Sequence, residues 1–244
     1  MPETHAKAHR TVSRVTDILE TVAQRPGVRM HELATALDAP KSSVFGLVKG
    51  LVSSGYLIED QGLYQLGPAL GNLLPLPAPD VAAAAGPGLE ALRDAFDETA
   101  MVGIAVGDSL VYLAAAESRQ LIRYSAPIRT RRPLYPPSAG KVVLAFRSPR
   151  RRDAYLETAI TDQQELGSAR DELATVRSEG VAFNRGETLP DVSAAARPIL
   201  TNGEVRGVIA VAGPTARITP RLPEIADALS GATAEAAKRL GLQR

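Results

Sequence analysis

The first third of the chain carries apolar residues with a helical period. Positions 12–23 are apolar at steps of three and four, and Arg-Pro-Gly at 25–27 ends this predicted helix. A second, shorter helix is expected at 33–37, before the break at 38–40, and a third at 41–53. Two short helices joined by a tight turn form a helix-turn-helix.

A β-hairpin is predicted directly after these helices. Residues 56–58 and 63–66 suit strands, and the polar residues at 59–62 suit the turn between them. Three helices followed by a hairpin are typical of a winged helix-turn-helix domain, which we expect in residues 1–66. Small domains of this kind bind DNA, bind proteins or are purely structural, and the pattern alone leaves these alternatives open.

If this domain binds DNA, its third helix enters the major groove with the N-terminal end foremost. Ser42 and Ser43 then lie where hydroxyl groups bond base edges or phosphates, and capping of the helix is an alternative role for both. Lys41 and Lys49 are expected to contact phosphates, since residues 39–55 contain no acidic residue.

A proline-rich segment separates this domain from the rest of the chain. Pro75, Pro77 and Pro79 exclude a continuous helix, so residues 67–80 are predicted to form an extended linker. Residues 81–244 are the second predicted domain.

Hairpins and helices are both expected in the second domain. Apolar runs at 101–106 and 110–115 flank a Gly-Asp-Ser turn, and a similar pair lies at 195–200 and 205–212. Both hairpins are expected in one antiparallel sheet. Helices are predicted over the apolar pattern of Leu89, Leu92 and Phe96, from Lys141, Pro149 and Ser168, and after Pro220. The fold class is therefore α+β, a winged helix-turn-helix followed by an antiparallel sheet flanked by helices.

Composition narrows the chemistry and the location. Of the 244 residues 45% are apolar and 23% charged, as in folded globular proteins. Cysteine is absent, which excludes disulfides and thiolate chemistry. No segment suits a signal peptide or a membrane span, so a cytoplasmic protein is expected. The net charge is +1 and the first 75 residues carry seven basic and seven acidic residues, so bulk charge does not indicate nucleic acid.

Motifs for catalysis are incomplete. Gly-Asp-Ser-Leu at 107–110 matches a signature of serine esterases, but no histidine follows His31 to activate the serine, and a hairpin turn is the favoured interpretation. Ser-Ala-Gly-Lys at 138–141 has the Ser-x-x-Lys spacing of penicillin-recognising enzymes without their Lys-Thr-Gly motif. We therefore predict no catalytic residue and no cofactor.

Metal and polyanion sites are also not predicted. His5 and His9 have the spacing of a shared helix face, yet no third ligand lies nearby in the sequence. The basic runs at 129–132 and 147–152 are interpreted as solvated faces.

Six segments together resemble the IclR family of bacterial regulators in their order and spacing, from about residue 11 to residue 240. They are TVSRVTDILE, HELATALDAPKSSVFGLVKGLVSSGYL, YQLG, PPSAGKVVLAF, RSEGVAFNRGE and GVIAVAGPTARIT. The resemblance implies a winged helix-turn-helix, a linker helix and an α+β effector-binding domain. It also implies homodimers or tetramers that bind palindromic double-stranded DNA operators and respond to a small-molecule effector.

The resemblance also assigns positions on the DNA-binding helix. The recognition helix maps to 41–49, with Ser42, Ser43 and Phe45 facing the bases. Gly46 stands where the family commonly has arginine, which removes a potential phosphate or guanine contact. The basic residues of the first helix complete the set of DNA-binding candidates: Arg10 and Arg14.

The resemblance likewise implies an effector pocket against the sheet. Members that bind small acids use the backbone near the Gly-Lys turn, which maps to Ser138 and Ala139, and further pocket positions map to Asn184, Ala194, Ala210 and Ala212. Members that bind small carboxylates tend to carry Asp, Cys and Ser at the last four positions, whereas this chain has Asn and three Ala. A larger, more apolar effector, such as an aromatic or acyl compound, is therefore expected. The alternative is a sheet interior packed with alanine that binds no effector.

The sequence thus favours a ligand-responsive operator-binding regulator that does not associate with membranes. A small-molecule-sensing co-regulator with weakened DNA binding and an enzyme on the second domain remain as alternatives. Whether transcription is repressed or activated stays open at this stage.

Overall fold

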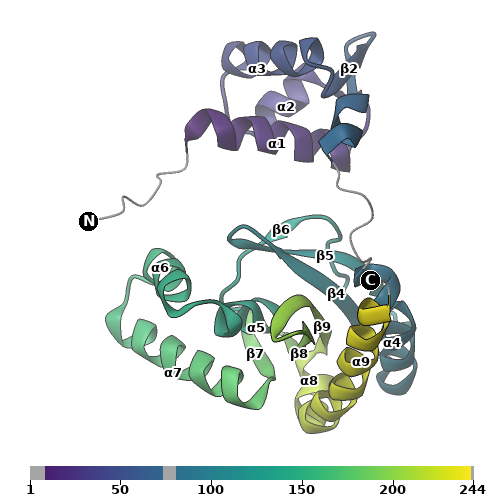
Figure 1. The fold of residues 1–244 in the computed structure, drawn as a ribbon, viewed down its shortest axis with the longest axis vertical. Coiled ribbons are helices and arrows are strands. Elements are labelled where there is room, and N and C mark those ends of the chain that lie inside the picture. Colours follow the sequence, from purple (N-terminus) through teal and green to yellow (C-terminus); the bar gives the residue numbers. More distant parts are fainter. Residues whose placement is uncertain (1–8, 74–80, 243–244) are drawn as a thin grey trace. The chain divides into compact units, whose positions relative to one another are not determined.

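The computed structural model describes residues 9–73 and 81–242, and Figure 1 shows the order of their helices and strands. The chain divides into two compact units, Met1–Ala78 and Pro79–Arg244. Each unit encloses a hydrophobic core of its own. The predicted extended linker is wrong over residues 68–73, which form a 3-10 helix, because the prolines that exclude a regular helix begin only at position 75. Pro75, Pro77 and Pro79 lie outside the described residues, so the rest of the linker and the domain limits remain predictions.

The first unit is a winged helix-turn-helix, as the sequence predicted. Its elements are the helices α1 (Arg10–Gln24), α2 (Met30–Ala36) and α3 (Lys41–Ser53), the strands β1 (Val28–Arg29), β2 (Leu57–Asp60) and β3 (Leu63–Leu66), and the 3-10 helix η1 (Pro68–Leu73). The strands pair in the order β1-β3-β2. The sequence analysis missed β1, because two residues are too few to show an alternating pattern.

The core of the first unit is made by the predicted apolar stripes. Ile18 and Val22 of α1, Leu33 of α2, and Val44 and Val48 of α3 are buried together. Spacings of three and four residues bring these side chains to one face of each helix. The polar face of α3 is left toward solvent.

The second unit is built on an antiparallel sheet of six strands, counted over the described residues. They are β4 (Thr99–Val106), β5 (Ser109–Ala116), β6 (Arg131–Arg132), β7 (Ala182–Leu189), β8 (Val192–Thr201) and β9 (Glu204–Pro214), in the order β6-β5-β4-β9-β8-β7. The two predicted hairpins share this sheet because β4 pairs with β9, where Met101 lies opposite Ala210.

Helices cover both faces of this sheet (Figure 1). They are α4 (Val81–Phe96), α5 (Ser138–Phe146), α6 (Pro149–Ala159), α7 (Gln163–Glu179), α8 (Thr215–Ile218) and α9 (Leu222–Leu242), with a 3-10 turn η2 (Thr219–Arg221) before α9. Along β9, Val208, Ala210 and Ala212 pack with α5 and α7, whereas Ile209 and Val211 pack with α4 and α9. The alternation follows from the two-residue period of a strand.

Two predicted helix starts were wrong. Helix α5 begins at Ser138 rather than Lys141, and α7 begins at Gln163 rather than Ser168. The carboxylate of Asp162 caps α7 by accepting hydrogen bonds from the backbone N–H groups of Gln164 and Glu165, at 2.9 and 2.8 Å. The sequence analysis overlooked this cap and placed the start five residues too late.

The edge strand β7 was also absent from the predicted elements. Only its first half pairs regularly with β8, and an irregularity separates Arg185 from Leu189. None of the helices in the described parts of the chain is long and apolar enough to cross a membrane.

Candidate functional site

The exposed face of α3 gathers five of the seven predicted DNA-binding residues. Lys41, Ser42, Ser43, Phe45 and Lys49 are all exposed. Phe45 is 49% exposed, so its ring is accessible to a binding partner on the same face as the two serines.

The capping alternative for the two serines of α3 is not what the structure shows. The N-cap residue is Pro40, and no side chain caps this helix. The hydroxyl groups of Ser42 and Ser43 have no hydrogen-bond partner within residues 9–73 and 81–242, so both are available for bases or phosphates.

Lys49 links α3 to the wing, which is the hairpin of β2 and β3. Its Nζ lies 2.7 Å from Oε2 of Glu59 on β2 and 5.7 Å from the centre of the Phe45 ring. The hydrogen bond to the Glu59 carboxylate raises the pKa of Lys49, so the ammonium stays charged at neutral pH. A phosphate approaching Lys49 must therefore compete with Glu59.

The other two DNA-binding candidates lie on a different helix. Arg10 is exposed at the first position of α1, and Arg14 is half-buried one turn later. Within residues 9–73, neither arginine forms an ion pair or a side-chain hydrogen bond with α3.

A small cavity in the second unit contains five of the six predicted effector positions. It is lined by Tyr112, Tyr124, Arg132, Pro137, Ser138, Asn184, Thr188, Leu189, Val192, Ala194, Ala210 and Ala212. Strand register explains the grouping, since Asn184 faces Ala194 across β7 and β8, and Ala194 faces Ala212 across β8 and β9. The three alanines form an apolar floor.

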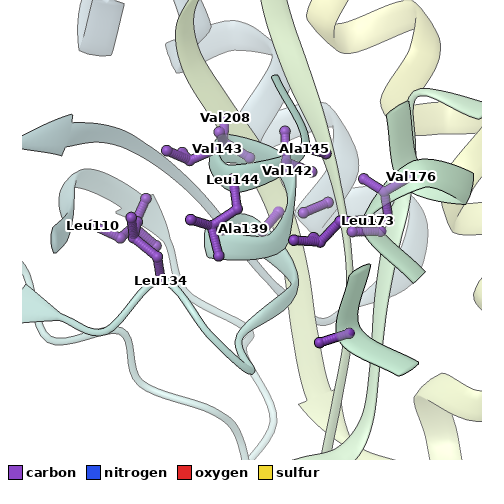
Figure 2. Packing of buried hydrophobic residues seen from close by; sticks show 14 of the residues in the cluster. Leu110, Leu134, Ala139, Val142, Val143, Leu144, Ala145, Leu173, Val176 and Val208 are labelled. Carbon is purple, nitrogen blue, oxygen red and sulfur yellow. The ribbon is translucent and has the colours of Figure 1, made fainter. Parts of the chain in front are cut away.

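Ala139 does not line the cavity. Its side chain is 1% exposed and packs in the core with Val142, Leu144 and Leu173, on the inner side of α5 (Figure 2). The side chain of Ala139 points about 100° around the helix from that of Ser138 and into the core, and neither its side chain nor its backbone is part of the cavity wall.

Some polar groups of the cavity have hydrogen-bond partners within the protein and others do not. The Nδ2 group of Asn184 donates to the Pro136 carbonyl at 3.2 Å and to Thr188 Oγ1 at 2.9 Å. Ser138 is 3% exposed at the N-terminus of α5, and its hydroxyl makes no hydrogen bond to any described residue.

Arg132 was assigned to a solvated face, yet it lines the cavity. No acidic residue lines the cavity, and Arg132 forms no ion pair with any residue in the described ranges. Sequence reasoning missed Arg132 because only the pairing of β6 with β5, where Arg132 lies opposite Leu110, carries this residue to the cavity.

Tyr112 also lines the cavity, and the sequence could have indicated it, since Tyr112 lies two residues after Leu110 and on the same face of β5. Burial raises its pKa, so the phenol stays neutral.

A larger hollow of about 390 Å³ lies beside the N-terminal end of α9. Its charged groups already have partners: Arg217 pairs with Glu98, and Arg221 with Glu224. The cavity over the alanine floor has unpaired polar groups and is the better candidate, although it holds only about 40 Å³ of free space.

The motifs considered for enzymes have structural roles. Gly107 and Asp108 form the turn between β4 and β5, with φ +59° at Gly107, and Asp108 pairs with Arg147 at 2.7 Å. Within residues 9–73 and 81–242 no cluster of His, Asp and Glu side chains could hold a metal ion.

Comparison with known families matches both units. Residues 11–61 match the IclR helix-turn-helix domain, and residues 76–239 match the C-terminal domain of bacterial transcriptional regulators of the IclR type. The chain belongs to the IclR family. The protein is accordingly a ligand-responsive, DNA-binding transcriptional regulator.

Individual IclR relatives align over most of their length. The regulator BhcR of Paracoccus denitrificans is 30% identical over 242 residues, covering 93% of this chain and 85% of BhcR. The repressor AllR of Escherichia coli K12 is 25% identical over 87% of this chain and 83% of AllR.

Solved structures of IclR proteins share the fold. A putative IclR regulator from Silicibacter sp. TM1040 has a TM-score of 0.75 at 27% identity, covering 95% of this chain and 96% of that one. An IclR homologue from Microbacterium hydrocarbonoxydans, solved with 4-hydroxybenzoate, has a TM-score of 0.72 at 20% identity, covering 95% and 99%.

Proposed function

We propose that this IclR-family protein is a homo-oligomeric repressor that binds a palindromic operator through α3 and the wing. The observation that supports this most directly is the solvent-facing row of α3, where two unpaired serine hydroxyls stand next to Lys41. Hydroxyl and ammonium groups at the N-terminal end of a recognition helix are suited to base edges and phosphates. A dimer matches a palindrome by its own two-fold symmetry. As a bacterial DNA-binding regulator it would work in the cytoplasm.

Fluorescence anisotropy with promoter-proximal DNA across a salt series tests the operator proposal. Removing one phosphate contact lowers the slope of log affinity against log salt by about 1. We expect this for Lys41→Ala, and loss of preference over a scrambled duplex for Ser43→Ala. Lys238→Ala, which removes an exposed charge from α9 of the other unit, should change neither.

Equal binding to operator and scrambled DNA at every salt concentration would reject operator recognition. That result would favour the co-regulator alternative, for which the absence of a side chain at Gly46 of α3 is the supporting observation.

The effector is proposed to be an aromatic or acyl compound that carries one acidic group. The apolar floor of Ala194, Ala210 and Ala212 suits a carbon skeleton, because alanine offers it no hydrogen bond. Arg132 and the Ser138 hydroxyl are two unpaired donors at the same cavity. Ser138 is buried, so its unpaired hydroxyl is costly, and a carboxylate would satisfy it together with the half-buried Arg132.

A matched pair of probes tests this effector class. We expect 4-hydroxybenzoate, the ligand of the Microbacterium homologue, to raise the melting temperature of this protein, and 4-hydroxybenzamide to leave it unchanged. Arg132→Gln should remove the difference between the two probes. Equal shifts with acid and amide in the unmodified protein would exclude an acid-selective pocket.

Effector binding is proposed to shift the affinity for DNA. Such a shift requires the effector to bind two conformations of the protein with different affinity. The anisotropy assay then serves as the readout, since an effector must release or tighten the operator complex.

A further inference from the structure

Lys141 is the most unusual ionisable residue of the second unit, and neither DNA nor effector binding uses it directly. Its side chain is fully buried on α5. The ammonium group donates to Glu172 of α7 at 2.6 Å, to the carbonyl of Phe183 at 3.1 Å and to Glu187 of β7. Three acceptors match its three N–H donors, so the ammonium is held in one place.

The two glutamates that share Lys141 belong to very different surroundings. Glu172 lies on the regular helix α7. Glu187 lies in the irregular part of β7, directly before Thr188 and Leu189, which line the cavity. The same ammonium therefore anchors one rigid element and one segment of the cavity wall.

The wall segment 186–188 has few other restraints. Strand β7 is the edge of the sheet, and these three residues have no ladder partner on β8. Before the segment, Asn184 is fixed by pairing with Ala194 of β8. After the segment, the carbonyl oxygen of Asp191 accepts a hydrogen bond from the backbone N–H of Thr215 at 2.8 Å. Between these ends, the carboxylate of Glu187 accepts from Lys141 and, at 3.3 Å, from the backbone N–H of the neighbouring Arg185 on the same strand. The hydroxyl oxygen of Thr188 accepts from Nδ2 of Asn184.

The other walls of the cavity are rigid by comparison. Strands β8 and β9 are paired on both sides, and α5 is buried along nearly its whole length. The backbone of Tyr124 is bound by the hydroxyl of the buried Thr99, at 2.5 Å. The free space of about 40 Å³ must nevertheless grow before an aromatic compound fits, since ligand pockets measure about 300 Å³ or more.

We propose that Lys141 is a positioning residue that latches segment 186–188 over the effector cavity through Glu187. Opening of the Lys141–Glu187 pair lets this segment move outward and admits the effector. Glu172 keeps the ammonium in place in both states. The effector role rests on the function proposed above, whereas the latch itself requires neither DNA nor effector.

The absence of cysteine in the chain allows a test without any ligand. Ala212→Cys places a single thiol in the cavity floor, at a position that is 4% exposed. Methyl methanethiosulfonate transfers its methylthio group to the thiolate and releases methanesulfinate. The labelling rate, followed by mass spectrometry, reports how often the cavity opens.

We expect Glu187→Gln to raise the labelling rate of Ala212→Cys about tenfold, and Glu172→Gln, which removes the same charge from the same ammonium, to change it less than about twofold. Glu187→Asp, which keeps the charge on a shorter side chain, should give an intermediate rate and serves if the glutamine variant does not fold. A thiol on the opposite face of the sheet, Ala195→Cys, should label equally slowly with and without Glu187→Gln, because the opening is local.

Unchanged labelling in both Glu187 variants would overturn the latch. Equal acceleration by Glu172→Gln would also overturn it, since Lys141 would then be a general structural tie. Loss of DNA or effector binding would leave these rates unaffected, so the two proposals fail independently.

Discussion

At the scale of single residues, two glycines on helices have opposite requirements. A Cβ at Gly140 of α5 would lie 2.1 Å from the carbonyl oxygen of Leu134, closer than any contact allows. A Cβ at Gly46 of α3 would meet nothing within 4 Å. Gly140 is therefore needed for close packing, whereas Gly46 is not needed for the fold.

The two glycines should respond oppositely to alanine. Gly140→Ala should destabilise the second unit by about 1–3 kcal/mol through overpacking. Gly46→Ala should stabilise the first unit by about 0.5–1 kcal/mol, because alanine restricts the unfolded chain and favours the helix. Calorimetric melting of both variants measures this, and a stable Gly140→Ala variant would show that α5 can move away from Leu134.

Lys49 and Glu59 give a second prediction at this scale. The ion pair between them is exposed and must be lost if Lys49 binds a phosphate. Glu59→Gln should therefore raise operator affinity about two- to fivefold at low salt, as expected for an exposed pair. The gain should vanish in the Lys49→Ala background when both are measured by anisotropy. A gain that persists there would mean that Glu59 acts by general repulsion of DNA.

At the scale of elements, the start of α7 depends on one carboxylate. Asp162 satisfies two N–H groups of the first turn, and Asp171 lies exposed in the middle of the helix. Asp162→Ala should lower the stability of the second unit by about 1 kcal/mol. Asp171→Ala is the matched control and should be neutral or slightly stabilising, since alanine is the better helix former. The difference in melting temperature between the two variants is the measurement. Equal loss of stability in both variants would contradict the assignment of Asp162 as the cap of α7.

The alanine floor belongs to the same scale, because three strands build it in register. Ala194→Leu should fill the 40 Å³ space and abolish the thermal shift with 4-hydroxybenzoate. DNA binding should persist, since the α3 surface belongs to the other unit. An undiminished thermal shift in this variant would place the effector elsewhere.

At the scale of the whole molecule, each hydrophobic cluster of the described residues lies within one unit. One core includes residues of α1 to α3 and the wing, and the others lie between the larger sheet and its helices. A fragment of residues 81–244 should therefore fold alone and melt within a few degrees of the second unit in the full chain. Circular dichroism of the fragment provides the check. A fragment that fails to fold would show that the first unit contributes to this core.

The amino-acid sequence by itself determined the helices, the hairpins and the family, because these depend on local periodicity and on motifs in a fixed order. It also placed Asn184, Ala194, Ala210 and Ala212 in one pocket, through the resemblance to the IclR family. Only the tertiary structure decided which neighbours these residues meet.

Three assignments needed that structure. The side chain of Ala139 faces the core, Arg132 reaches the cavity from a strand of two residues, and Lys141 is fully buried between Glu172 and Glu187. Strand pairing and helix packing bring together residues that are far apart in the sequence, such as Lys141 and Glu187, which are separated by 46 positions. Local sequence patterns do not encode such distances, since they record only which face of an element is apolar.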